Sequence, residues 1–129
     1  MHPFRAAIEA RDLPGALALL AEDVVFRSPV VFKPYHGRAA VAPILAGVVR
    51  VFEDFRYVRE IGAVGARDHA LLFEARVGNR HLEGCDFLHT ADDGLIDEFA
   101  VMVRPLSAAL ALAEAMKAQL EVAAQGHPG

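Results

Sequence analysis

Four consecutive segments in the second half of the chain alternate apolar and polar residues, and this pattern limits the fold more than any other feature. The segments cover residues 55–62, 68–77, 80–90 and 95–104. A period of two is typical of β-strands, because successive side chains point to opposite faces. Short turns separate the segments, and Gly78-Asn79 is a two-residue hairpin signal. Three hairpins in series predict an antiparallel meander.

Before this meander, one strand and one long helix are expected. β-branched and aromatic residues over 24–28 predict a strand, and the segment 31–37 reads as a loop because it contains proline and glycine. A helix follows over about 38–52. Pro43 is unfavourable inside a helix, so either the regular helix starts near Val41 or it is kinked.

Proline and capping residues mark three further helices. Pro3 suits the first turn of a helix at the start of the chain, and Asp12 can cap a second, short helix. After the meander, Pro105 ends the last strand and Ser107 caps a helix over about 107–124. The residues that remain form a frayed tail: Gly126, Pro128 and Gly129.

Helices followed mostly by strands predict the α+β class. The chain of 129 residues fits a single domain, with a core over 1–105 and the C-terminal helix added to it. A long antiparallel sheet must cover its apolar face, and the N-terminal helices are available for this. The expected architecture is a curved, cone-shaped sheet wrapped around those helices, with an open mouth that suits a small ligand.

Charge and cysteine content narrow the class of protein. A formal net charge of −4 argues against a nucleic-acid-binding protein, which needs a clustered basic face. Cys85 is the one cysteine, so no internal disulfide can form and a reducing compartment is the natural expectation. We expect no signal peptide and no membrane span, and hence a cytoplasmic location.

Asp86 is the sharpest candidate for chemistry. It alternates with Leu82, Gly84 and Leu88, so it should point to the apolar face of its strand. Desolvation there should raise its pKa and leave an acid that can donate or shuttle a proton. The alternative is a buried carboxylate that bonds a tyrosine, histidine or arginine for structure alone.

Other polar residues are weaker candidates. His36 suits general acid–base work, although it can equally be a loop residue that bonds a backbone carbonyl. Tyr35 and Ser28 can hydrogen-bond a ligand or serve the local structure. Phe32 and Met102 are expected to line the cone among its apolar residues.

The opposite face of the Asp86 strand carries a row of mixed polarity: His81, Glu83, Cys85, Phe87 and His89. Histidine and cysteine four residues apart on a strand are about 13 Å apart, which is too far for one metal ion. We therefore expect no metal site, and interpret the row as solvated or facing a second copy of the chain.

The order of elements and several motifs resemble the nuclear transport factor 2-like superfamily, especially its SnoaL-like, polyketide cyclase-like members. The motifs are Asp12-Leu-Pro-Gly-Ala, Glu22-Asp-Val-Val-Phe, Ser28-Pro29, Tyr35-His-Gly-Arg and Asp93-Gly-Leu-Ile-Asp-Glu. The resemblance covers residues 1 to about 105. This superfamily contains ketosteroid isomerases and other enzymes as well as non-catalytic modules, so the fold does not fix the function.

Matched by motif to ketosteroid isomerases, the chain keeps one of three catalytic groups. Phe4 stands at the position of a tyrosine, Ser28 at that of the base aspartate, and Asp86 at that of a protonated aspartate. Serine without a base cannot remove a carbon-bound proton, so steroid isomerisation is rejected. The resemblance to SnoaL-like cyclases again implies Asp86 as the proton-transfer group.

Two functions remain open at this point. One is cofactor-free acid–base chemistry through Asp86 on a small hydrophobic or aromatic molecule, as cyclisation, isomerisation or dehydration. The other is a ligand-binding or dimerisation module without catalysis. The resemblance also implies a homodimer through the sheet. The sheet's outer face is expected to be apolar in places, at Leu71, Phe73, Ala75 and Val77.

Overall fold

The computed structural model describes the backbone of residues 1–125 and the side chains of residues 1–121; the predicted tail lies outside them. Apart from β2, the elements follow the expected order. They are α1 (Pro3–Glu9), α2 (Leu13–Ala18), β1 (Leu20–Arg27), β2 (Tyr35–His36), α3 (Arg38–Val51), β3 (Glu53–Ile61), β4 (Asp68–Val77), β5 (Arg80–Thr90), β6 (Ile96–Arg104) and α4 (Leu106–Gln125). The α+β class is confirmed. Within the described residues, no helix has both the length and the apolar character needed to cross a membrane.

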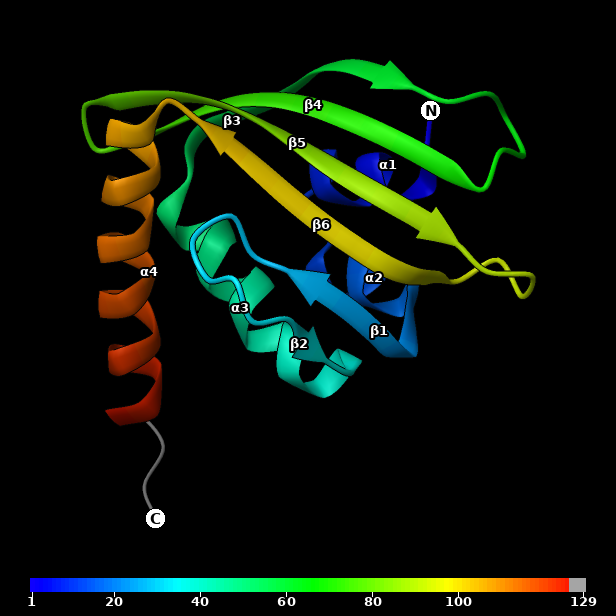
Figure 1. The fold of residues 1–129 in the computed structure, drawn as a ribbon, viewed down its shortest axis with the longest axis horizontal. Helices are drawn as coiled ribbons and strands as arrows, with labels where there is room; N and C mark the ends of the chain where they lie inside the picture. Colours follow the sequence, from blue (N-terminus) through cyan, green and yellow to red (C-terminus); the bar gives the residue numbers. More distant parts are fainter. Residues whose placement is uncertain (126–129) are drawn as a thin grey trace.

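One six-stranded curved sheet carries the fold, in the order β2-β1-β6-β5-β4-β3. Strands β3 to β6 form the predicted antiparallel meander, and Val77 pairs with Arg80 across the two-residue turn. β1 lies parallel to β6, which joins the beginning of the chain to the last strand. Figure 1 shows the N-terminal helices and α3 on one side of this sheet.

The beginning of the chain differs from expectation in two strands. β1 starts at Leu20, earlier than the predicted strand over 24–28. β2 lies inside the segment predicted as a loop, because Tyr35 and His36 pair with Phe26 and Val25. Two residues are too few to show a periodicity, so only the pairing with β1 reveals this strand.

The helix starts follow local capping chemistry. The Asp12 carboxylate accepts a hydrogen bond from the Gly15 amide at 2.9 Å, as its predicted capping role requires. Ser107 is not a cap, because α4 begins one residue earlier. The carbonyl of Pro105 accepts the amides of Ala108 and Ala109 instead.

Helix α3 begins at Arg38 and runs through Pro43, which confirms the predicted helix over about 38–52 and excludes the alternative of a start near Val41. Proline has no amide hydrogen for the preceding turn. The helix forms nevertheless because it buries Val41, Ile44 and Leu45, and tertiary packing outweighs one missing hydrogen bond.

Helix α4 stands across one end of the sheet and packs against α3 and β4 to β6 (Figure 1). Its buried stripe is Ala108, Leu112 and Met116, spaced by four residues. A Cβ atom at Gly47 of α3 would lie 3.2 Å from the Met116 Cε, so the glycine permits this close approach. The C-terminal helix therefore covers part of the core of its own chain.

The core lies between the helices and the concave face of the sheet. The rings of Phe4 and Phe26 each contact Phe99 edge to face, with centroids 5.2 Å apart. Leu71, Phe73 and Ala75 also belong to this core, and Val77 packs against it. The expectation that these four residues lie on the outer face is therefore wrong. The strand phase is shifted by one residue, which exchanges the two faces.

Candidate functional site

Asp86 lies in the middle of β5 on the inner face of the sheet. It is 6% exposed and is the buried charged residue among the described side chains. Its neighbours across the sheet are Leu71 on β4 and Val101 on β6. The predicted burial of this carboxyl group against apolar residues is confirmed.

Tyr57 on β3 is the hydrogen-bond partner of Asp86. Its hydroxyl donates to the Asp86 Oδ2 at 2.8 Å, and the tyrosine is itself buried. The guanidinium carbon of Arg5 lies 5.9 Å from the centre of the Tyr57 ring. Sequence reasoning missed Tyr57, although a tyrosine that alternates with Phe55 on an inner face needs a partner for its hydroxyl.

Burial brings the pKa of Asp86 close to neutral pH. Desolvation raises the pKa of Asp86 from 3.8 to about 7, although the hydrogen bond from Tyr57 opposes this rise. Burial and the charge of Asp86 raise the pKa of Tyr57 above its usual value, so its hydroxyl keeps its proton. Asp86 can therefore release or accept a proton at neutral pH while Tyr57 only donates a hydrogen bond.

Asp86 and Tyr57 belong to the wall of a cavity of about 690 Å³. Most of the wall is apolar and comes from helices and strands on all sides: Phe4, Phe26, Ile44, Leu45, Val48, Phe52, Phe55, Phe99, Val101, Leu112 and Met116. The volume is in the range of small-molecule sites, and a few polar groups in an apolar wall are typical of such sites.

Three of the predicted ligand-binding residues line this cavity, namely Phe4, Ser28 and Tyr35. Phe4 is almost fully buried and fills space where a tyrosine would bring a hydroxyl. The Ser28 oxygen accepts the amide of Val30 at 3.1 Å, which leaves its hydroxyl hydrogen for another acceptor. Ser28 and Tyr35 are therefore two further hydroxyl-bearing residues in the cavity wall, in addition to the Tyr57–Asp86 pair.

The other three predicted residues do not line the cavity. His36 is exposed, because Tyr35 takes the inner side of β2 and the next residue must take the other. Phe32 is fully exposed in the loop after β1. Met102 is 63% exposed on the outer face of the sheet, since its neighbour Val101 points inward. The expectation that Phe32 and Met102 line the cone is therefore wrong, and His36 lies outside the cavity wall.

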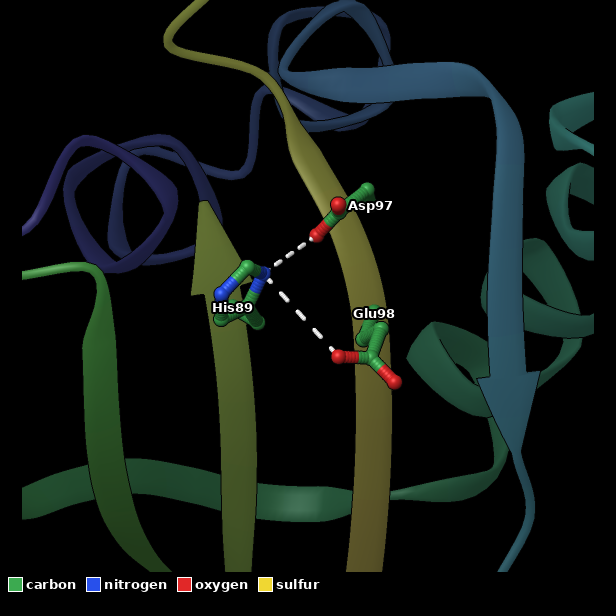
Figure 2. Close-up of side chains that lie close together, drawn as sticks. All are labelled: His89, Asp97 and Glu98. Carbon is green, nitrogen blue, oxygen red and sulfur yellow. Dashed lines mark hydrogen bonds and ion pairs between the residues drawn. The ribbon is translucent and has the colours of Figure 1, made fainter. Parts of the chain in front are cut away.

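A cluster of possible metal-ligating groups lies on β5 and β6 outside the cavity (Figure 2). The Nδ1 of His89 lies 2.6 Å from an Asp97 oxygen and 3.9 Å from a Glu98 oxygen. Glu98 also pairs with Arg27 at 3.8 Å. The hydrogen bond with Asp97 raises the pKa of His89 above its usual value. The geometry fits an ion pair of a histidine with carboxylates, and His89 is the member of the predicted outer row that takes part.

Comparisons with known proteins place the chain among relatives of one fold. The family model of the SnoaL-like domain matches residues 2–99. Comparison with curated protein sequences found no match.

Solved structures show how far this likeness extends. A steroid delta-isomerase from Pseudomonas aeruginosa is 45% identical, with 94% of this chain and 88% of that chain covered and a TM-score of 0.88. A conserved bacterial protein with a cystatin-like fold from Silicibacter pomeroyi is 38% identical, with 97% and 90% covered and a TM-score of 0.87. A nuclear transport factor 2-like protein from Cytophaga hutchinsonii is 18% identical, with 80% and 85% covered and a TM-score of 0.59, and shares the fold alone.

Proposed function

The chain belongs to the SnoaL-like domain family, and we propose that its cavity binds an apolar small molecule on which Asp86 acts as acid and base. Members of one fold perform different functions, so the proposal rests on the site and not on the family. The observation that carries it is a carboxyl group, buried in the wall of a cavity of about 690 Å³, whose pKa is raised to about 7.

The proposed step is proton transfer at a carbon beside a carbonyl group. The Asp86 carboxylate takes the proton from that carbon, and the electron pair of the broken bond moves to the carbonyl oxygen as an enolate. The same carboxyl group then returns the proton to another atom of the ligand. This step is common to isomerisation, cyclisation and many dehydrations, and a group with a pKa near 7 suits both directions.

Hydroxyl groups of the cavity can stabilise the developing oxygen charge. Ser28 and Tyr35 line the same cavity as Asp86. Hydrogen-bond donors aimed at a developing oxyanion are a major source of rate enhancement in such reactions. Tyr57 has another role in this proposal, since it holds the Asp86 carboxyl in place through its 2.8 Å hydrogen bond.

The name of the Pseudomonas relative supports proton transfer on an apolar ligand. The proposed reaction differs from the two-carboxylate reaction of ketosteroid isomerases, because Ser28 stands where they carry the base. The proposal therefore assigns both proton removal and proton return to Asp86.

The experiment measures the exchange of hydrogen for deuterium beside the carbonyl of 2-tetralone, an apolar aromatic ketone, in D₂O by NMR. We expect the protein to accelerate exchange, with a rate that increases as pH rises through about 7. Asp86→Asn should lose roughly 100-fold or more of this acceleration. Asp97→Asn, which removes a carboxylate outside the cavity, is the matched control and should keep it. An unchanged rate in Asp86→Asn would exclude Asp86 as the base.

A binding module without catalysis is the second candidate. The hydrogen bond from Tyr57 favours it, because the same bond is how a purely structural buried carboxylate is satisfied. Binding of the ketone without accelerated exchange would support this second function.

A further inference from the structure

Some charged residues in the wall of the cavity form ion pairs or hydrogen bonds with other protein groups, and others do not. Three of them form ion pairs with residues outside the cavity: Glu9 with Arg5 at 2.8 Å, Asp54 with Arg76 at 2.7 Å, and Arg56 with Glu74 at 3.1 Å. Asp12 caps α2 through the Gly15 amide. The charges of these four groups are therefore partly satisfied within the protein.

Arg11 and Lys117 also line the cavity, and both are exposed, which places them at its rim. Among the side chains that the structure describes, neither has a carboxylate within ion-pair distance. Glu114 and Glu121 are three and four residues away from Lys117 along α4 and do not form such a pair. The cavity thus combines an apolar wall with two cations that are available to a ligand.

The backbone conformation of Arg11 is a second, independent feature that sets this residue apart. Its φ is 57°, in the left-handed region that favours glycine. The Arg11 amide donates to the Ile8 carbonyl and the Asp12 amide to the Ala7 carbonyl, which is the helix-ending motif that usually carries glycine at this position. A large side chain here opposes the local conformational preference, and such positions cluster at functional sites.

A comparison within the chain strengthens this point. Asp54 is the other residue besides glycine with a positive φ in the described residues, at 53°. It also lines the cavity. Aspartate adopts this conformation readily, whereas arginine does so rarely. The unusual residue for a positive φ is therefore Arg11, which is also the one of the two without an ion-pair partner among the described side chains.

We propose that Arg11 and Lys117 bind the anionic end of the cavity's ligand, which is therefore an apolar molecule that carries a carboxylate or a similar oxyanion. This inference rests on the proposed function in that the cavity must bind a ligand. The apolar wall holds the body of the molecule, and the two cations select against neutral molecules of the same shape. Attraction between charges at an exposed rim weakens with salt, so the selectivity decreases as ionic strength rises.

The experiment compares two fluorescent probes with the same aromatic skeleton. 1-Anilinonaphthalene-8-sulfonate carries one anionic group, and N-phenyl-1-naphthylamine lacks it. We expect the double variant Arg11→Gln/Lys117→Gln to bind the sulfonate roughly threefold to tenfold more weakly. Its affinity for the neutral probe should stay within about twofold. Addition of salt should weaken sulfonate binding to the wild type and have less effect on the double variant.

Arg59→Gln/Arg80→Gln is the matched control. It removes two exposed cations that neither line the cavity nor form an ion pair among the described residues, and it changes the net charge equally. The control should bind both probes like the wild type. An equal loss of sulfonate affinity in the control would overturn the proposal. So would an Arg11→Gln/Lys117→Gln variant whose affinities for the two probes fall equally, or one whose affinities do not change.

Arg11→Gly separates a ligand-binding role from a structural one. Glycine suits a φ of 57°, so the midpoint of thermal unfolding should stay or rise while sulfonate binding weakens. Unweakened sulfonate binding in this variant would exclude Arg11 from the proposed site.

A cavity-filling variant distinguishes failure of this inference from failure of the proposed function. Ala113→Trp adds a large side chain to the wall on α4 and should weaken both probes. If neither probe binds the wild type, or if Ala113→Trp binds both normally, the proposed function fails together with this inference. If both probes bind in the cavity without charge selectivity, the inference that the ligand carries an anionic group is refuted, whereas the proposed function is not.

Discussion

Replacing Asp86 by asparagine should change how the free energy of unfolding depends on pH. In the folded protein the pKa of Asp86 is raised from 3.8 to about 7. The folded state therefore binds this proton more tightly than the unfolded state does. The stability from this group is fully present below about pH 4, and it is lost as pH rises through about 7. The full loss corresponds to about 4 kcal/mol.

Asparagine has a similar shape and no titrating proton, so the variant should lack this loss. Chemical unfolding of both proteins between pH 5 and pH 8 gives the comparison. We expect the free energy of unfolding of Asp86→Asn, relative to wild type, to increase by about 3 kcal/mol across that range. A constant offset from the new amide group does not matter, because only the change with pH reports the carboxyl group.

Asp23→Asn is the control, since Asp23 is exposed and outside the cavity. The free energy of unfolding of Asp23→Asn should change with pH in the same way as that of the wild type. A difference between Asp86→Asn and wild type that stays flat from pH 5 to pH 8 would refute the desolvation of Asp86. The proposed acid–base role would then lose its physical basis.

Three further outcomes are expected. Tyr57→Phe should raise the pKa of Asp86 further, measured by NMR of its carboxyl carbon, because the hydrogen bond now holds that pKa down; a lowered pKa would contradict this. Gly84→Ala should reduce the free energy of unfolding by about 1–3 kcal/mol in denaturant titrations, since the added Cβ would lie 2.1 Å from the Phe73 ring; equal stability would show that the ring moves freely. We also propose that a second copy covers the outer sheet face, so light scattering should give a dimer mass that Met102→Glu reduces to one chain. A single-chain mass for the wild type would exclude this dimer.

The sequence predicts strands well where turns fix their ends. The two-residue turn at Gly78-Asn79 sets the pairing of β4 with β5, and the alternation around Asp86 then gives its inward direction. The same turn pairs Leu71 with Asp86, so the two residues share the inner face, and the expectation of Leu71 on the outer face disagreed with the register that the turn sets.

The sequence does not predict which side chains point inward where apolar and polar residues do not alternate. Val101, Met102 and Val103 are all apolar, so alternation cannot decide which of them points inward. Met102 was expected to line the cone, but Val101 does so instead. Phe32 lies in a loop without any periodicity. Tyr57 was missed for a different reason: its contact with Asp86 joins residues 29 positions apart across three strands, and register across strands is not a local property.

The parallel pairing of β1 with β6 has a consequence for how the molecule is made. β1 hydrogen-bonds to β2 and to a strand that is synthesised about seventy residues later. A nascent chain that stops before Ile96 leaves one long edge of β1 open. Pairing between such distant segments slows folding, because a large loop must close before any contact compensates its entropy. Chains that end before β6 should therefore be prone to aggregate, and β1 can join the meander only after β6 has left the ribosome.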